Sequence, residues 1–392
     1  MTNAAGAPGP VAGRRHSAYL DSASSEPLHP AARDVLLAAL DQGYADPRRL
    51  HGAGRSARLL LDNAREVVAQ CLGVRRDEVT FTSSGTDAVH RGLLGLVAGN
   101  PVRGSTAVLS SVEHSAVRHA VSWLARRDDA APVQVPVDGS GRVDADAFVE
   151  ACLAPGVAVA ALQAANHEVA TTQPVPRVAE RLAGSGVPLL VDACAAAGRL
   201  DLPSGWTAAA ASAHKWGGPA GVGLLLLRKG ARWGNPFPGE MALEDFGGGF
   251  PDVPGALAAA AALQAVVAER DGVNARHVAM VDRIRDAAGA IPDVEVVGDP
   301  VDRLPHLVTF SCLYVDGEAL VTELDRRGFG VASGSACTAS TLEPSHVLTA
   351  MGVLTHGNVR VSLTRDTTEE DVDGFLRVLP EVVRDIRAEV GL

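Results

Sequence analysis

The sequence predicts an α/β protein in which a large domain with a mostly parallel sheet is joined to a smaller α+β domain. Between about residues 76 and 230, apolar strand-like runs alternate with helical stretches. Such alternation is typical of parallel strands joined by right-handed crossovers. After residue 249 an alanine-rich helical segment is followed by shorter strand and helix units. The 392 residues also exceed the length of about 250–300 residues at which a single core usually divides.

The predicted strands are almost continuously apolar, as expected for a sheet that helices cover on both faces. They span residues 78–82, 105–112, 157–166, 187–193, 206–214 and 221–227. Helices are predicted between them at 85–99, 115–127, 144–154 and 174–184. The later part of the chain is predicted to begin with two helices, at 254–272 and 273–290, and to end in a helix that starts at Thr368.

These patterns divide the chain into three expected regions. Residues 1–18 are rich in Gly, Ala and Pro and are expected to form a disordered tail. Residues 19–250 are expected to form the large domain. The first residues of this range have the alternative of packing on the small domain. Residues 251–392 are expected to form the small C-terminal domain, which carries a loop with Cys337.

The composition argues against several classes of function. A formal charge of −11 does not match the basic surface that binds nucleic acid or anionic membranes. No run approaches the roughly 18 apolar residues of a membrane-spanning helix. The first 18 residues also lack the pattern of a secretory signal. We therefore expect a cytoplasmic protein with no nucleic-acid or membrane partner.

Cysteine and lysine positions narrow the chemistry further. The five cysteines form no CxxC or CxxH pattern, so neither a disulfide framework nor a metal site is expected. Only two of the 35 basic residues are lysines, Lys215 and Lys229. Chemistry that needs a primary amine therefore has two candidate positions.

Three features are predicted to meet at the carboxyl edge of the sheet. A strand-to-helix turn with Gly85 and Thr86 exposes backbone N–H groups suited to an anion, although an ordinary helix cap also accounts for it. Asp192 ends a buried strand. Lys215 follows an apolar run and is expected to be a desolvated amine suited to a Schiff base, unless it simply emerges into solvent. An anion site, a carboxylate and an amine are the set that pyridoxal phosphate requires.

Six motifs between residues 19 and 348 carry a family resemblance. YLDSASSEP, LHGAGRSA, FTSSGTDA, VEHSAV and ASAHKWGGPAGVG stand in chain order, followed by ASGSACTASTLEPSHVL at 332–348. They resemble the motifs of the class V aminotransferase family of pyridoxal-phosphate enzymes, and within it those of the group I cysteine desulfurases. The last motif matches the family nearly letter for letter. The resemblance, which extends to residue 373, implies the fold-type I architecture of pyridoxal-phosphate enzymes, with the cofactor bound by the large domain.

The resemblance also implies roles for individual residues. Lys215, Cys337 and His114 are the implied catalytic residues. Arg360 is implied to bind the substrate carboxylate, and His114 to stack on the cofactor ring. The implied cofactor-binding residues are Gly85, Thr86, His114, Asn166, His167, Asp192, Ser212, His214 and Lys215. Without the resemblance, His114 is equally well explained as an ordinary residue at the start of a helix. Arg360 is then equally well explained as a residue on a surface strand.

The chain departs from the family pattern at three places. His167 and Ala195 stand where the family has an Asn and a Gln that contact the phenolic oxygen of the cofactor. Ala256 stands near the position of a Thr that reaches the phosphate bound by the partner subunit. We therefore expect the contacts to the phenolic oxygen and the phosphate of the cofactor to differ from those of the family, while the catalytic residues are kept.

The function implied is that of a cysteine desulfurase, which moves sulfur from L-cysteine to Cys337 as a persulfide and releases L-alanine. The resemblance also implies a homodimer and an unidentified protein that accepts the sulfur. Three related reactions remain as alternatives on the same scaffold: a carbon–sulfur lyase, a selenocysteine lyase or an aminotransferase. The alternative outside enzymes is an inactive sulfur carrier or scaffold protein.

Overall fold

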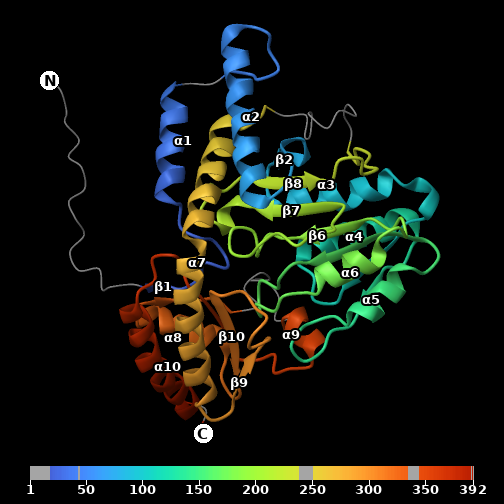
Figure 1. The fold of residues 1–392 in the computed structure, drawn as a ribbon. Coiled ribbons are helices and arrows are strands. Elements are labelled where there is room, and N and C mark those ends of the chain that lie inside the picture. The colour runs from blue at the N-terminus through green and yellow to red at the C-terminus, as the bar shows by residue number, and fades with distance from the viewer. Residues whose placement is uncertain (1–17, 43–44, 238–249, 334–343, 390, 392) are drawn as a thin grey trace, which may run out of the picture.

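The computed structural model describes residues 18–42, 45–237, 250–333, 344–389 and 391. A seven-stranded sheet forms its centre, and a three-stranded sheet lies below it in the view of Figure 1. The strands of the large sheet, in spatial order, are β2 (Val79–Thr82), β8 (Gly223–Leu227), β7 (Ala208–Ser212), β6 (Leu189–Asp192), β5 (Val157–Gln163), β3 (Thr106–Ser110) and β4 (Val133–Val135).

The large sheet confirms the expected α/β class. Every neighbouring pair is parallel except those of β8, which runs antiparallel to both β2 and β7. The six predicted runs contain six of its strands. The sequence analysis missed β4, because this strand has only three residues and exposes two of them, Val133 and Gln134.

Both faces of the large sheet are covered, which explains its continuously apolar strands. Along β5, Ala160 and Leu162 join one apolar core, whereas Val159 and Ala161 join another. The first core lies under α5 (Ala145–Cys152), α6 (Val175–Leu182) and the first half of α7 (Val253–Gly289). The second core lies under α3 (Gly85–Ala98) and α4 (Ser115–Asp128).

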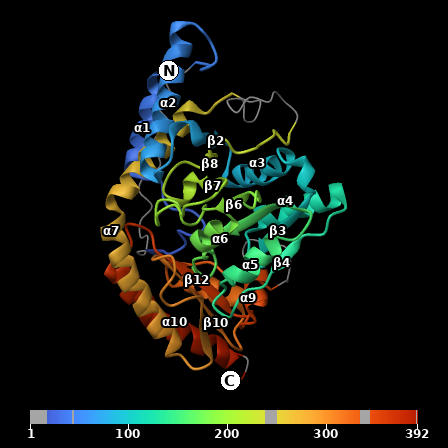
Figure 2. The ribbon, with the colours of Figure 1, turned by 45° about the vertical axis from the view of Figure 1, so that its right-hand side comes forward.

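Helix α7 runs along both sheets (Figures 1 and 2). The prediction of two separate helices here was wrong. Gly272, at the predicted break, is exposed inside one continuous helix. A glycine in a helix costs only about 1 kcal/mol, and burial of Ala258 in the first core and Ile284 in a core of the small sheet offsets this cost. Two further helices, α1 (Pro30–Gln42) and α2 (Gly52–Leu72), pack against α7.

The small sheet has β10 (Leu307–Cys312) between β12 (Asn358–Ser362) and β9 (Val294–Val297), all antiparallel to their neighbours. Helices α8 (Gly317–Arg326) and α10 (Glu369–Glu389) and the second half of α7 cover its apolar core. A short helix, α9 (His346–Met351), precedes β12 and packs against Val112 and Val169 beside the large sheet. The division into domains at residue 250 stays a prediction.

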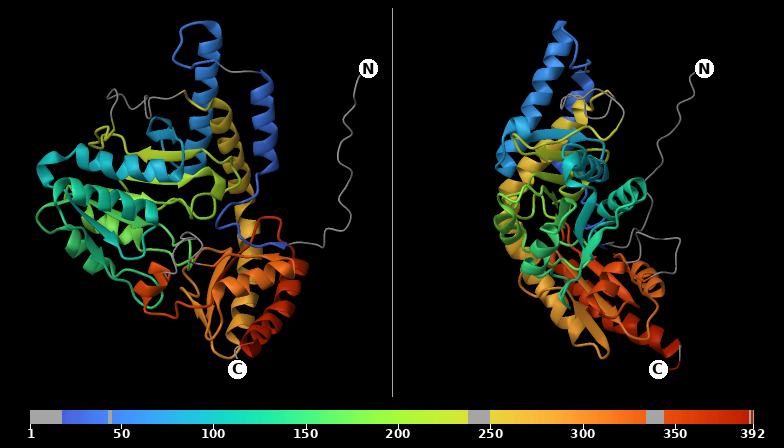
Figure 3. Two further views of the ribbon diagram at one scale, coloured as in Figure 1. Left: turned by 180° about the vertical axis from the view of Figure 1, so that it is seen from behind. Right: turned by 90° about the vertical axis from the view of Figure 1, so that its right-hand side faces the viewer.

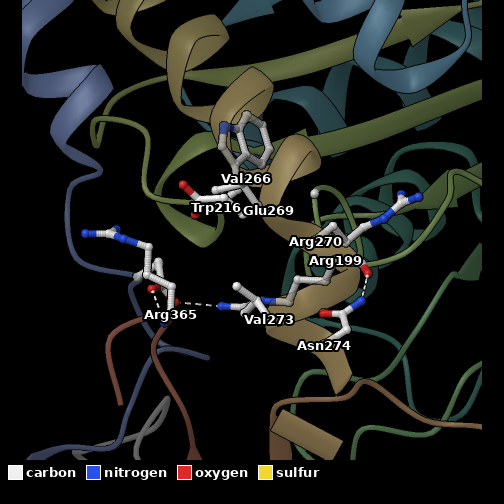
Figure 4. Close-up of a pocket in the computed structure, with 10 residues that line it drawn as sticks. Arg199, Trp216, Val266, Glu269, Arg270, Val273, Asn274 and Arg365 are labelled. Atoms are coloured by element: carbon white, nitrogen blue, oxygen red, sulfur yellow. Dashed lines mark hydrogen bonds and ion pairs between the residues drawn. The ribbon is translucent and has the colours of Figure 1, made fainter. Parts of the chain in front are cut away.

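The segment that follows residue 17 connects the two sheets. Strand β1 (Ala18–Tyr19) pairs with β11 (Phe329–Gly330), and Leu20 joins the core of the small sheet. The chain then passes between the sheets toward α1 (Figure 3). There Glu26 forms an ion pair of 2.7 Å with Arg199, and both side chains are buried. Figure 4 shows Arg199 at a small cavity of about 20 Å³ beside α7.

Two further points about the fold concern membrane-spanning helices and clusters of metal-ligating side chains. None of the helices that it describes is long and apolar enough to cross a membrane. Among the described residues, no group of three or more His, Cys, Asp or Glu side chains is arranged to hold a metal ion. The expected tail at 1–18 lies outside the described residues, except for Ala18 in β1.

Candidate active site

A cavity of about 260 Å³ lies at the carboxyl ends of β5, β6 and β7. Ligands bind preferentially at this edge of an open parallel sheet. The cavity brings together eight of the residues that the sequence singled out: Gly85, Thr86, His114, His167, Asp192, Ser212, His214 and Lys215.

The start of α3 forms one wall of the cavity. Ser84 caps the helix, because its Oγ accepts a hydrogen bond from Asp87 N–H at 3.0 Å. A helix start leaves its first N–H groups, here those of Gly85 and Thr86, without intrahelical carbonyl partners. A Cβ added at Gly85 would lie 2.7 Å from Ser212 Cβ and 2.8 Å from Cys194 Sγ. Only glycine therefore lets the helix start approach the ends of β6 and β7 so closely, and the result is a cradle for an anion.

Asp192 supplies the carboxylate at the end of β6. Its side chain is only 6% exposed, and its Oδ1 accepts a hydrogen bond from Cys194 N–H at 2.9 Å. Burial, together with the nearby charge of Asp192, raises the pKa of the Cys194 thiol well above its usual value. Cys194 is therefore a neutral thiol beside a carboxylate.

The residues after β7 form the opposite wall. A short 3₁₀ turn (Ala213–Lys215) follows the strand, and Lys215 Nζ donates to the backbone carbonyls of Ala23 and Ser24, the latter at 3.0 Å. Ser212 Oγ and His214 Nδ1 are 3.0 Å apart. Burial, and secondarily the charge of Lys215, lowers the pKa of His214 to about 4, so that its ring is neutral near pH 7.

Two further histidines meet in the cavity. The rings of His114 and His167 lie edge to face, with centroids 4.8 Å apart. Burial lowers the pKa of His114, and it lowers that of His167 well below the usual value, with the other cations nearby adding to this effect. His114 Nδ1 accepts from Ala116 N–H at 3.1 Å. Both rings are therefore neutral near pH 7, and Nε2 of His114 is the nitrogen left for exchange of a proton.

Arg360 lies on β12, next to the cavity. It is only 4% exposed, and its Nη1 donates to the carbonyl of His167 at 3.2 Å. Its Nη2 donates to Asp21 Oδ1 at 2.9 Å and to Ser24 Oγ at 2.7 Å. The alternative of a surface strand residue is thus wrong for Arg360. Asp21 and Ser24 were missed as site residues, because their partner lies more than 330 positions away in the chain.

Asn166 is the one predicted cofactor contact among the described residues that the structure does not bring to the cavity. Its Nδ2 donates to the carbonyl of Val112 at 3.1 Å, and its Oδ1 accepts from Glu168 N–H and Val169 N–H. The side chain is fully buried. Its polar atoms hold the turn after β5, so a contact of Asn166 with a cofactor stays a prediction.

The chain resembles known proteins over most of its length. The Aminotransferase class-V family model matches residues 18–375. The chain belongs to this family.

Curated relatives include the "Cysteine desulfurase" of Cereibacter sphaeroides, which is 36% identical over 94% of this chain and 96% of its own. The "IscS-like cysteine desulfurase" of Mycobacterium tuberculosis is 38% identical over 94% and 97% of the two chains. A solved "NIFS-LIKE PROTEIN" superposes with a TM-score of 0.86 over 94% of this chain and all of its own, at 27% identity. The apo structure of a cysteine desulfurase from Thermococcus onnurineus, at 21% identity over 94% and 95% of the chains, has a TM-score of 0.83 and supports the fold.

Burial also decides the state of three cysteines outside the cavity. Cys152 and Cys312 are buried, and burial raises their thiol pKa values to about 12 and about 11. Cys71 is half-buried, and burial raises its pKa as well. These thiols are inert near pH 7, because the thiolate is the reactive form. Cys337 lies outside the described residues.

Gly85→Ala should lower the free energy of unfolding by about 1–3 kcal/mol, the usual cost of overpacking, because the new Cβ would overlap Ser212 and Cys194. Gly272→Ala is the matched control. Its Cβ would meet no atom within 4 Å, so it should raise the free energy of unfolding by about 0.5–1 kcal/mol. Denaturant unfolding of both variants measures the two changes. Equal stability of wild type and Gly85→Ala would contradict the close approach at this position.

Proposed function

We propose that this protein is a pyridoxal-phosphate-dependent cysteine desulfurase, which moves sulfur from L-cysteine to Cys337 and releases L-alanine. One observation carries the proposal above the others. A glycine-started helix, a buried carboxylate and one of only two lysines of the chain line the same cavity of about 260 Å³. The curated relatives named cysteine desulfurase support the choice of reaction.

The cavity fits the cofactor at three points. The first turn of α3, with Gly85 and Thr86, would hold the phosphate together with Ser212 and His214. Asp192 would pair with the protonated ring nitrogen, since a buried carboxylate needs a cationic partner. Lys215 Nζ would hold the cofactor covalently. His114 would stack on the ring, and His167 would contact it in place of the asparagine found in the family.

When bound, the cofactor supplies a carbonyl group that takes up the substrate amine and an electron sink for the substrate carbons. The side chains of this protein then have separate tasks. Lys215 and His114 exchange protons with the substrate, which the neutral ring of His114 allows. Arg360 orients the substrate through its carboxylate. The Cys337 thiolate would attack the substrate sulfur and form an S–S bond, while the bond between this sulfur and the substrate β-carbon breaks and leaves its electron pair on the carbon side. The sulfur stays on Cys337 as a persulfide, and L-alanine leaves after that carbon has taken up a proton.

The proposal extends to the assembly. We expect a cytoplasmic homodimer that passes the sulfur to a separate acceptor protein. Residues 19–250 would form the large domain that binds the cofactor, and residues 251–392 the small domain that carries Cys337. Ala256 is buried in the first turn of α7, where its methyl group joins the first apolar core.

Purified protein should be yellow, and borohydride reduction should fix the cofactor to Lys215. The alternative amine, Lys229, lies 3.8 Å from Asp77 in an exposed ion pair, outside the cavity. Peptide mapping of the reduced protein decides between the two lysines. An adduct on Lys229, or a colourless protein that takes up no cofactor, would contradict the proposal.

Cys337→Ser should still bind L-cysteine, seen as a change in the visible spectrum, but should release no sulfide under reductant. The thiol acts only after the substrate has been bound, so binding and turnover separate in this variant. Cys71→Ser, which changes a half-buried thiol outside the cavity, is the control and should keep full turnover. Undiminished sulfide release by Cys337→Ser would favour a carbon–sulfur lyase.

A further inference from the structure

Both hydrogens on Nη2, one of the two terminal nitrogens of Arg360, already form hydrogen bonds with other residues of the chain. Nη2 carries two N–H groups, and these donate to Asp21 Oδ1 and Ser24 Oγ at 2.9 and 2.7 Å. Ser24 Oγ in turn donates to Asp21 Oδ1 at 3.0 Å. The two acceptors therefore form one hydrogen-bonded unit around Nη2.

The rest of the guanidinium has spare donors. Nη1 makes one hydrogen bond, to the carbonyl of His167. Nε is buried and has no hydrogen-bond partner among the described residues. A buried N–H without a partner costs about 1–3 kcal/mol, so an unfilled donor beside the cavity points to a ligand that would accept from it.

The covalent geometry of arginine limits how such a ligand can bind. A carboxylate takes a guanidinium with two parallel hydrogen bonds, either along the edge of Nε and Nη2 or along the edge of Nη1 and Nη2. Both edges include Nη2. A bidentate carboxylate must therefore take over an N–H that now belongs to Asp21 or Ser24.

We propose that Asp21, supported by Ser24, is an internal competitor for the carboxylate-binding edge of Arg360 and thereby sets the affinity of the site for its substrate. The inference rests on the proposed role of Arg360. It adds that the protein holds its substrate carboxylate more weakly than the buried arginine alone would, because an acidic group of the same chain must be displaced.

The turn that carries the competitor is fixed in place. Tyr19 Oη donates to the carbonyls of Asp21 and Ser25 at 3.0 and 2.9 Å. The same turn accepts from Lys215 Nζ through two backbone carbonyls. The turn of Asp21 thus contacts both Lys215 and Arg360. Since the Asp21 side chain is 20% exposed, against 5% for Arg360, the carboxylate can be released toward solvent while the arginine stays.

The test uses the cofactor-loaded protein and the equilibrium dissociation constant of L-alanine, measured by titration calorimetry. Asp21→Asn keeps an oxygen acceptor but removes the charge, and a charged hydrogen bond is about twice as strong as a neutral one. L-alanine should therefore bind about fivefold more tightly to Asp21→Asn. Ser24→Ala removes the second acceptor and should also tighten binding. Damage to the fold cannot produce a gain in affinity.

Two controls isolate the effect. Asp128→Asn removes the same charge from an exposed pair with Arg127 and should leave the dissociation constant unchanged. L-alaninamide lacks the carboxylate, so Asp21→Asn should not tighten its binding. Unchanged or weaker binding of L-alanine by both Asp21→Asn and Ser24→Ala would overturn the inference. If Arg360→Met left the affinity of wild type for L-alanine intact, the role proposed for Arg360 would fail instead.

Discussion

Parallel strands that share a sheet must end at a common edge, and the candidate site depends on this constraint. Asp192 and Ser212 end β6 and β7, Gln163 ends β5, and α3 starts at the same edge. Helices cover both faces of the sheet, so this edge is where polar side chains can gather without unpaired burial. The glycine at position 85 brings the helix start within contact of two strand ends.

A second constraint comes from the segment between β1 and α1. It contacts the small sheet through Leu20 and the large sheet through the buried pair of Glu26 with Arg199. The turn between these anchors accepts hydrogen bonds from Lys215 and Arg360. One short stretch of chain therefore fixes the position of Lys215, just after β7 in the large sheet, relative to Arg360 on the small sheet.

The sequence could predict whatever depends on local pattern. Apolar runs located six strands of the large sheet, and strand ends located Asp192 and Lys215. Contacts between distant segments could not be predicted in this way: Asp21 meets Arg360 across more than 330 positions, and only the fold brings them together. Local pattern also does not show where the Asn166 side chain points, because a side chain next to a strand end can hydrogen-bond the backbone instead of facing the cavity. The exposed Gly272 looked like a helix break, although packing at both ends of α7 keeps the helix continuous.

The central claim is that the cavity at the sheet edge and Cys337 act together on L-cysteine. Mass spectrometry of the wild-type protein after incubation with L-cysteine, combined with analysis of the small-molecule products, tests it most directly. The account predicts one added sulfur atom on Cys337 and L-alanine in the medium. Pyruvate and ammonia, or a transferred amino group, without a sulfur adduct on Cys337 would contradict it.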